Sequence, residues 1–186
     1  MARYDIVVFD LDGTLVDSDE ALVIPFVTLG VPRDAISFGH PIEVECTRLG
    51  LDVLDYVAAY DTTVVQPFPG VADMLGRLGR WAVCSNKHPI SGLAELERLG
   101  WEPEIALFSD DFGGAAKELG PVLAAADVHA GSLVFVGDTA HDELCARDAG
   151  CDFIWAGWNP RTMATAPNGT VASTPAELLE LIGSTR

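Results

Sequence analysis

The feature that most constrains the fold is an alternation of short apolar runs with longer segments of helical spacing. Five runs are nearly continuous in apolar residues and predict strands that are buried on both faces: 4–10, 81–85, 105–109, 133–138 and 152–157. Helical patterns separate or follow them at 69–79, 89–99, 115–127 and 140–149, and a last helix is expected to start near Thr174. This order predicts an α/β fold, a parallel sheet with helices on both faces.

The alternation is interrupted between residues 18 and 66. This stretch has no convincing strand, but it has apolar helical patterns at 20–29, 41–49 and 51–60, broken by glycines and prolines. We therefore expect a small α-helical insert at 18–66, and we expect residues 1–17 and 67–186 to form the core.

Composition excludes several classes of partner. The chain has 186 residues, with 28 acidic and 11 basic side chains and a formal net charge of −17. Because no basic run is present, neither a nucleic acid nor an anionic membrane surface is expected as a partner. The apolar runs are too short for a membrane helix or a signal peptide, and the four cysteines form no CxxC pair. We expect a cytoplasmic protein whose thiols are reduced. We also expect it to be a monomer or a homodimer.

Acidic side chains follow the predicted strands where those strands end. The first strand runs into FDLDGTLVDS (9–18), the second into CSNK (84–87) and the fourth into GDTAHD (137–142). Parallel sheets bind ligands beyond the carboxyl ends of their strands. Four aspartates gather there: Asp10, Asp12, Asp138 and Asp142. Such a cluster would repel itself without a cation, and oxygen ligands together with phosphate chemistry indicate Mg²⁺.

Taken singly, these aspartates have simpler interpretations. Asp12-Gly13 is typical of a turn, and Asp138 is typical of a helix N-cap. Those interpretations weaken because the same edge of the sheet also gathers Ser85 and, after the third strand, Lys117. Lys87 and Lys117 are the only lysines of the chain, which makes their positions informative. An ammonium group beside an acidic cluster can stabilise the acids and a transferring phosphoryl group.

In combination, DLDGT at 10–14, Ser85, Lys117 and GDTAHD at 137–142 resemble the haloacid dehalogenase superfamily. More narrowly, they resemble its phosphoglycolate phosphatase-like branch, with a helical cap inserted after the first motif. The resemblance covers residues 5 to about 157. It implies a Rossmann-like core and a Mg²⁺-dependent phosphatase that hydrolyses a small-molecule phosphate ester through an aspartyl-phosphate.

The resemblance also implies a role for each matching residue. Asp10 would be the nucleophile, and Asp12 the general acid and base. Ser85 and Lys117 would take part in catalysis. The phosphate would be bound by Gly13, Thr14, Ser85, Asn86 and Lys117. The metal would be held by Asp10, Asp138 and the backbone carbonyl of Asp12, and Asp142 would join them or hold a metal-bound water.

Two positions depart from the usual pattern of this branch. Glu118 follows Lys117 where proline is usual, and His88 stands where proline is frequent. His88 could act near the substrate or simply start a surface helix. The sequence also leaves open whether Trp155 and Trp158 line the site or pack.

Individual residues argue for or against the other reactions that members of the superfamily catalyse. Asp12 argues against dehalogenation, because the dehalogenases lack this second aspartate. The insert has no lysine, which argues against the Schiff-base chemistry of phosphonate hydrolysis. A sugar-phosphate mutase of the β-phosphoglucomutase type remains open, and so does a non-catalytic binding module.

The charge of the insert bears on the substrate. It carries eight acids against Arg33, Arg48 and a possible third cation, His40. This balance disfavours a second phosphate on the substrate. A carboxylate such as that of phosphoglycolate would need one of these three cations to face the site.

Overall fold

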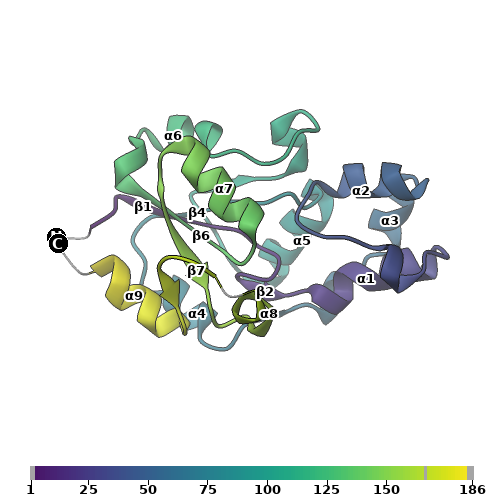
Figure 1. Ribbon diagram of the computed structural model, residues 1–186, viewed down its shortest axis with the longest axis horizontal. Helices are drawn as coiled ribbons and strands as arrows, with labels where there is room; N and C mark the ends of the chain where they lie inside the picture. The colour runs from purple at the N-terminus through teal and green to yellow at the C-terminus, as the bar shows by residue number, and fades with distance from the viewer. Residues whose placement is uncertain (1–2, 166, 184–186) are drawn as a thin grey trace.

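The computed structural model describes residues 3–165 and 167–183, and a six-stranded parallel sheet forms its centre (Figure 1). The strands stand in the order β5-β4-β1-β6-β7-β8. Their bounds are β1 (Ile6–Phe9), β4 (Trp81–Cys84), β5 (Ile105–Leu107), β6 (Leu133–Gly137), β7 (Asp152–Ala156) and β8 (Val171–Ala172). The chain runs outward from β1 to β5 and then crosses to β6 on the other side of β1, so the order of strands reverses beside β1. The predicted α/β class is confirmed, and ligands of such sheets bind at this reversal.

Successive side chains of the sheet enter two separate hydrophobic layers. Val7 and Phe9 face the layer formed with the helices α4 (Val71–Leu75), α5 (Pro89–Leu99) and α9 (Pro175–Gly183). Ile6 and Val8 face the layer formed with α6 (Gly120–Ala126) and α7 (Ala140–Ala149), which lie above the sheet in Figure 1. Cover on both faces explains why the strands read as continuous apolar runs.

Three helices form a helical cap at one end of the molecule (Figure 1). They are α1 (Asp19–Thr28), α2 (Ile42–Leu49) and α3 (Val53–Ala59), with the short 3₁₀ turns η1 (Arg33–Ala35) and η2 (Thr62–Val64) beside them. Gly50 ends α2 at a φ of 73°, and the Asp52 carboxylate caps α3 by accepting the N–H of Leu54 at 2.8 Å. The rings of Phe26 and Tyr56, 4.5 Å apart, join α1 to α3.

A two-stranded antiparallel ribbon connects the cap to the core. It pairs β2 (Val16–Asp17) with β3 (Gln66–Pro67), so the chain leaves and re-enters the core at the same place. The sequence did not predict this ribbon, because two-residue strands are too short to show a period.

Some helices are shorter than their patterns suggested. The helix expected at 69–79 is α4, and the helix expected at 115–127 begins only at Gly120. Gly113 and Gly114 have φ of 62° and 83°, and Pro121 suits the first turn of a helix, so the segment before Gly120 is a loop. This loop carries Lys117. The short helix α8 (Pro160–Ala164) was not expected.

All four cysteines are free thiols, and each is buried or half-buried. Within the described part of the chain, no helix has both the length and the apolar character needed to cross a membrane.

Candidate active site

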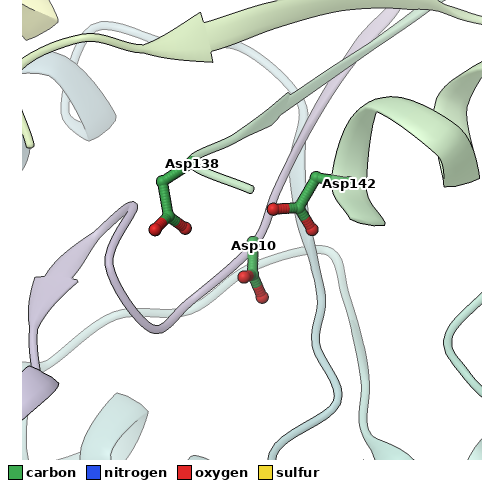
Figure 2. Close-up of side chains that lie close together, drawn as sticks. All are labelled: Asp10, Asp138 and Asp142. Atoms are coloured by element: carbon green, nitrogen blue, oxygen red, sulfur yellow. The ribbon is translucent and has the colours of Figure 1, made fainter. Parts of the chain in front are cut away.

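Three aspartates, two at the ends of neighbouring strands and one at the start of a helix, form a buried acidic cluster (Figure 2). Asp10 follows β1, Asp138 follows β6, and Asp142 lies in the first turn of α7. One carboxylate oxygen of each lies within 4.8 Å of the others. Burial and the neighbouring carboxylates raise the pKa of Asp10 to about 6 and that of Asp138 to about 7, although Lys117 and Arg161 act in the opposite direction. Three buried oxygen ligands that repel one another fit a hard cation such as Mg²⁺.

The loop after β1 packs closely against the side chain of Asp138. Gly13 has a φ of 75°, and a Cβ at this position would lie 2.5 Å from Oδ2 of Asp138. The hydroxyl of Thr14 donates to Oδ1 of Asp138 at 3.1 Å. Both residues were predicted to bind phosphate, and the structure places them against this aspartate.

Lys117 bridges Asp10 and Asp142. Its Nζ lies 2.9 Å from Oδ1 of Asp10 and 2.6 Å from Oδ1 of Asp142. Burial lowers the pKa of Lys117, but the two carboxylates outweigh burial and raise it above its ordinary value. The N–H of Leu11 also donates to Oδ1 of Asp10, at 2.8 Å, and among the described residues Oδ2 has no hydrogen-bond partner. Asp10 is therefore held by one oxygen, and the other is available for reaction.

Asp142 uses both of its carboxylate oxygens within the protein. While Oδ1 contacts Lys117, Oδ2 accepts the N–H of Thr139 at 2.9 Å and its hydroxyl at 2.6 Å. This second pair belongs to the N-terminal cap of α7. Asp142 thus joins Lys117 to the N-terminus of α7.

The carboxylate of Asp12 lies apart from the acidic cluster, in an ion pair with Lys87. The Nζ of Lys87 is 2.7 Å from Oδ1 of Asp12, 3.0 Å from Oε1 of Glu95 and 2.8 Å from the hydroxyl of Tyr60. Lys87 is 5% exposed and Glu95 is fully buried. Burial lowers the pKa of Lys87, but Asp12 and Glu95 raise it above its ordinary value. From the sequence, Lys87 was notable but had no assigned role. Glu95 and Tyr60 were not predicted as its partners, because an acidic residue within a helical pattern is typical of an exposed position.

Ser85 and Asn86 follow β4 and line the pocket. The hydroxyl of Ser85 accepts the N–H of Lys87 at 3.3 Å. The side chain of Asn86 accepts the N–H of Lys117 at 2.7 Å and donates to the carbonyl of Gly39 in the cap at 3.4 Å. Asn86 therefore joins the Lys117 loop to the cap.

The loop after β7 supports the loop after β1 from behind. The indole of Trp158 donates to the carbonyl of Thr14 at 2.8 Å, and Asn159 donates to the carbonyl of Gly13 at 2.8 Å. Trp155 is buried and packs edge-on against Phe153. Both tryptophans therefore have supporting roles, and neither lines the pocket.

Arg161 was missed by the sequence analysis. Its guanidinium lies 2.7 Å from Oδ2 of Asp138 and 2.9 Å from Oδ1 of Asp19 at the start of α1, so it connects the acidic cluster to the cap. The signal was available, because Arg161 follows the carboxyl end of a strand in the same sheet.

One pocket lies between the core and the cap. Six of the predicted site residues line it: Asp10, Asp12, Ser85, Asn86, Lys117 and Asp142. The other three, Gly13, Thr14 and Asp138, lie against one another beside it. A parallel α/β core with an acidic cluster where its strand order reverses, covered by a helical cap, defines the class of haloacid dehalogenase-like hydrolases.

Comparisons with known proteins support this class. The chain is 31% identical over 185 residues to a phosphoglycolate phosphatase of Xanthomonas campestris pv. campestris, a match that covers 83% of this chain and 84% of that protein. It is 32% identical over 178 residues to a phosphoglycolate phosphatase of Caulobacter vibrioides, covering 77% and 75%. No family model matches the chain.

Solved structures share the fold at lower identity. A haloacid dehalogenase-like hydrolase from Streptococcus pneumoniae has a TM-score of 0.75 at 23% identity, covering 97% of this chain and 99% of that one. A hydrolase from Pseudomonas syringae has a TM-score of 0.74 at 20% identity, covering 97% of each chain. The chain belongs to the haloacid dehalogenase superfamily, in its phosphoglycolate phosphatase-like branch.

Proposed function

We propose that the protein is a Mg²⁺-dependent phosphatase that hydrolyses a small-molecule phosphomonoester through an aspartyl-phosphate on Asp10. The observation that carries this proposal is the arrangement of Asp10. One of its oxygens is held by Lys117 and the N–H of Leu11, and its other oxygen has no hydrogen-bond partner among the described residues that line the pocket. Relatives that are named phosphatases support the reaction class.

In the first half of the proposed reaction, Oδ2 of Asp10 attacks phosphorus. The bond from phosphorus to the ester oxygen breaks, and Asp12 delivers a proton to the leaving oxygen. The raised pKa of Asp10, about 6, still leaves this carboxylate mainly ionised at neutral pH. Lys117 faces the nucleophile and would balance negative charge on the phosphoryl oxygens.

In the second half, water attacks phosphorus and releases Asp10 and inorganic phosphate. Asp12 takes the proton from this water, which restores the protonation state needed for the next cycle. The ion pair with Lys87 fixes the position of Asp12 in both halves. Asp10 and Asp138 would hold the metal, with Asp142 beside them, and bound Mg²⁺ would neutralise charge on the phosphoryl group.

The test is phosphate release from a panel of phosphomonoesters with Mg²⁺ and, separately, with a chelator. Asp10→Asn should lower kcat by about a thousandfold or more, because an amide is a poor nucleophile. Asp73→Asn is the matched control, since Asp73 is an exposed aspartate outside the pocket. The proposal is wrong if no ester releases phosphate, or if Asp10→Asn is as active as the parent. Conversion of a hexose phosphate into its isomer, with little free phosphate, would favour a mutase.

We also propose that the enzyme acts in the cytoplasm as a monomer or a homodimer. The free state of all four cysteines supports a reducing compartment. Mass determination in solution would decide the number of subunits.

A further inference from the structure

The wall that the cap presents to the pocket is largely apolar. Phe26, Tyr56 and Ile42 line it from the three cap helices, and Phe38 lines it from the segment between α1 and α2. The hydroxyl of Tyr56 is engaged, since it donates to a backbone carbonyl at 3.1 Å. Phe38 is 40% exposed. An exposed aromatic ring that lines a pocket is a ready contact for an apolar group.

The cations of the cap are already paired with carboxylates of the cap. Arg33 pairs with Glu20 at the surface. Arg48 and His40 both pair with Glu45, at 2.6 Å and 2.9 Å. The structure describes all residues of the cap. Of its three basic residues, Arg33, Arg48 and His40, only His40 lines the pocket.

Glu45 binds the side chains of both Arg48 and His40. It is 1% exposed, and although burial raises its pKa, hydrogen bonds from Arg48, Ser37 and His40 outweigh burial and lower the pKa to about 2. Glu45 is therefore ionised at neutral pH, and it engages both Arg48 and the ring of His40.

The cations of the core that line the pocket are paired as well. Lys87, Lys117 and Arg161 each contact two carboxylates. His88 accepts the N–H of Ile90 at Nδ1, at 3.3 Å, so this ring nitrogen is engaged by the backbone of α5. Among the described pocket residues, a phosphoryl group would meet Lys117, but a second negative charge on the substrate would meet no lysine or arginine that lacks an acidic partner.

We propose that this pocket selects phosphomonoesters whose leaving group is uncharged and largely apolar, such as an aryl or alkyl alcohol. It would discriminate against esters that carry a carboxylate, phosphoglycolate included, because that carboxylate would be desolvated without a partner and would face Asp12 and Glu45. This inference rests on the proposed phosphatase function of the same site. The proposed substrate class differs from phosphoglycolate, the substrate in the names of the Xanthomonas and Caulobacter relatives.

A matched pair of substrates tests the charge directly. The esters 4-carbamoylphenyl phosphate and 4-carboxyphenyl phosphate have nearly the same shape and differ by one negative charge. With Mg²⁺, kcat/KM should be higher for the carbamoyl ester by about tenfold or more. Equal values, or a preference for the carboxylate or for phosphoglycolate, would overturn the inference and leave the phosphatase proposal intact. Failure to release phosphate from any ester would instead overturn the phosphatase proposal.

A variant of Phe38 tests the apolar wall. Phe38→Ala should lower kcat/KM for 4-carbamoylphenyl phosphate by about threefold to tenfold and change that for methyl phosphate little, because methyl phosphate has no ring to contact. Val44→Ala is the matched control, since Val44 is an exposed apolar residue of α2 that does not line the pocket. An equal loss for both esters, or no loss for either, would contradict a contact between Phe38 and the leaving group.

A variant of His40 tests whether the cap provides a cation. His40→Gln should change kcat/KM for the carboxyphenyl and carbamoylphenyl esters by the same factor, because His40 is committed to Glu45. A selective loss for the carboxyphenyl ester would show that His40 binds the substrate carboxylate, and that result would overturn the inference.

Discussion

Lys87 neutralises two carboxylates at a place from which water is largely excluded. Removal of one partner from a buried ion pair leaves uncompensated charge, so Lys87→Met should lower the free energy of unfolding by about 3–5 kcal/mol. Urea unfolding followed by circular dichroism measures this change. A loss below about 1 kcal/mol would show that Lys87 does not carry the charge balance of this cluster.

A double variant separates the structural role of Lys87 from its role in the reaction. Lys87→Met combined with Glu95→Gln removes the buried carboxylate as well and should recover part of the lost stability. Activity should stay low, because Asp12 still lacks the ammonium group that fixes its position. Recovery of activity together with stability would mean that Lys87 supports only the fold.

At this scale, the sequence identified the side chains that belong to short motifs at strand ends. Asp10, Asp12 and Asp138 could be found because their neighbours in the chain predict a strand that stops there. The partners of Lys87 could not be found in this way. Asp12 is 75 positions away from it, and only the packing of α5 brings Glu95 beside it.

At the scale of elements, two helix ends differ in how well their residues suit the backbone. Asp127 ends α6 with a φ of 55°, whereas Gly100 ends α5 with a φ of 67°. Because glycine adopts this conformation without strain, Asp127→Gly should raise the free energy of unfolding by about 0.5–1 kcal/mol. Gly100→Ala should lower it by about 1 kcal/mol, and a Cβ at Gly100 would meet no atom within 4 Å, so the effect is one of backbone conformation.

Urea unfolding of both variants checks these signs. Both lie outside the pocket, so phosphatase activity should not change. If Asp127→Gly were destabilising, the side chain of Asp127 would have to contribute more than the strain of its backbone.

Sequence patterns predicted helices and strands correctly where these are long or fully buried. The five expected strands and the helices α5 and α7 lie within a few residues of the ranges that the patterns indicated. Residues 115–119 carry an apolar pattern that continues into α6, yet the glycines before them make this segment a loop. We propose that the ribbon of β2 and β3 divides core from insert, near 17/18 and 66/67.

At the scale of the whole molecule, the acidic residues differ in how they make stability depend on pH. The pKa values of Asp10 and Asp138, about 6 and about 7, lie above the ordinary value of 3.8. Between about pH 4 and pH 7 these two carboxyl groups bind more protons in the folded protein than in the unfolded chain, so they reduce stability as pH rises through that window. Glu45, whose pKa is lowered from 4.5 to about 2, has the opposite effect: it contributes stability above about pH 4.5 that is lost as the pH falls toward 2.

Mg²⁺ binding should reverse the loss of stability that Asp10 and Asp138 cause. The metal needs ionised ligands, so the rise in Tm on adding millimolar Mg²⁺ should be larger at pH 8 than at pH 5. Differential scanning fluorimetry measures the rise, and Asp138→Asn should reduce it at pH 8. A rise that is equal at both pH values would contradict a site made of these carboxylates.

The parallel α/β fold followed from the order of strands and helices in the sequence. What the sequence could not provide is the way the cap meets the core. Asn86 reaching Gly39, and Arg161 reaching Asp19, are contacts between distant parts of the chain that no local pattern encodes.

The most direct test of the central claim is chemical trapping of the intermediate. Borohydride reduces an acyl phosphate to an alcohol, so an aspartyl-phosphate at Asp10 would become homoserine. The parent enzyme is quenched with borohydride during turnover of an active ester with Mg²⁺, and the peptide that contains residue 10 is examined by mass spectrometry. We predict homoserine at position 10, absent without substrate and absent in Asp10→Asn. Rapid phosphate release with Asp10 unmodified, or homoserine at position 12 instead, would contradict the account.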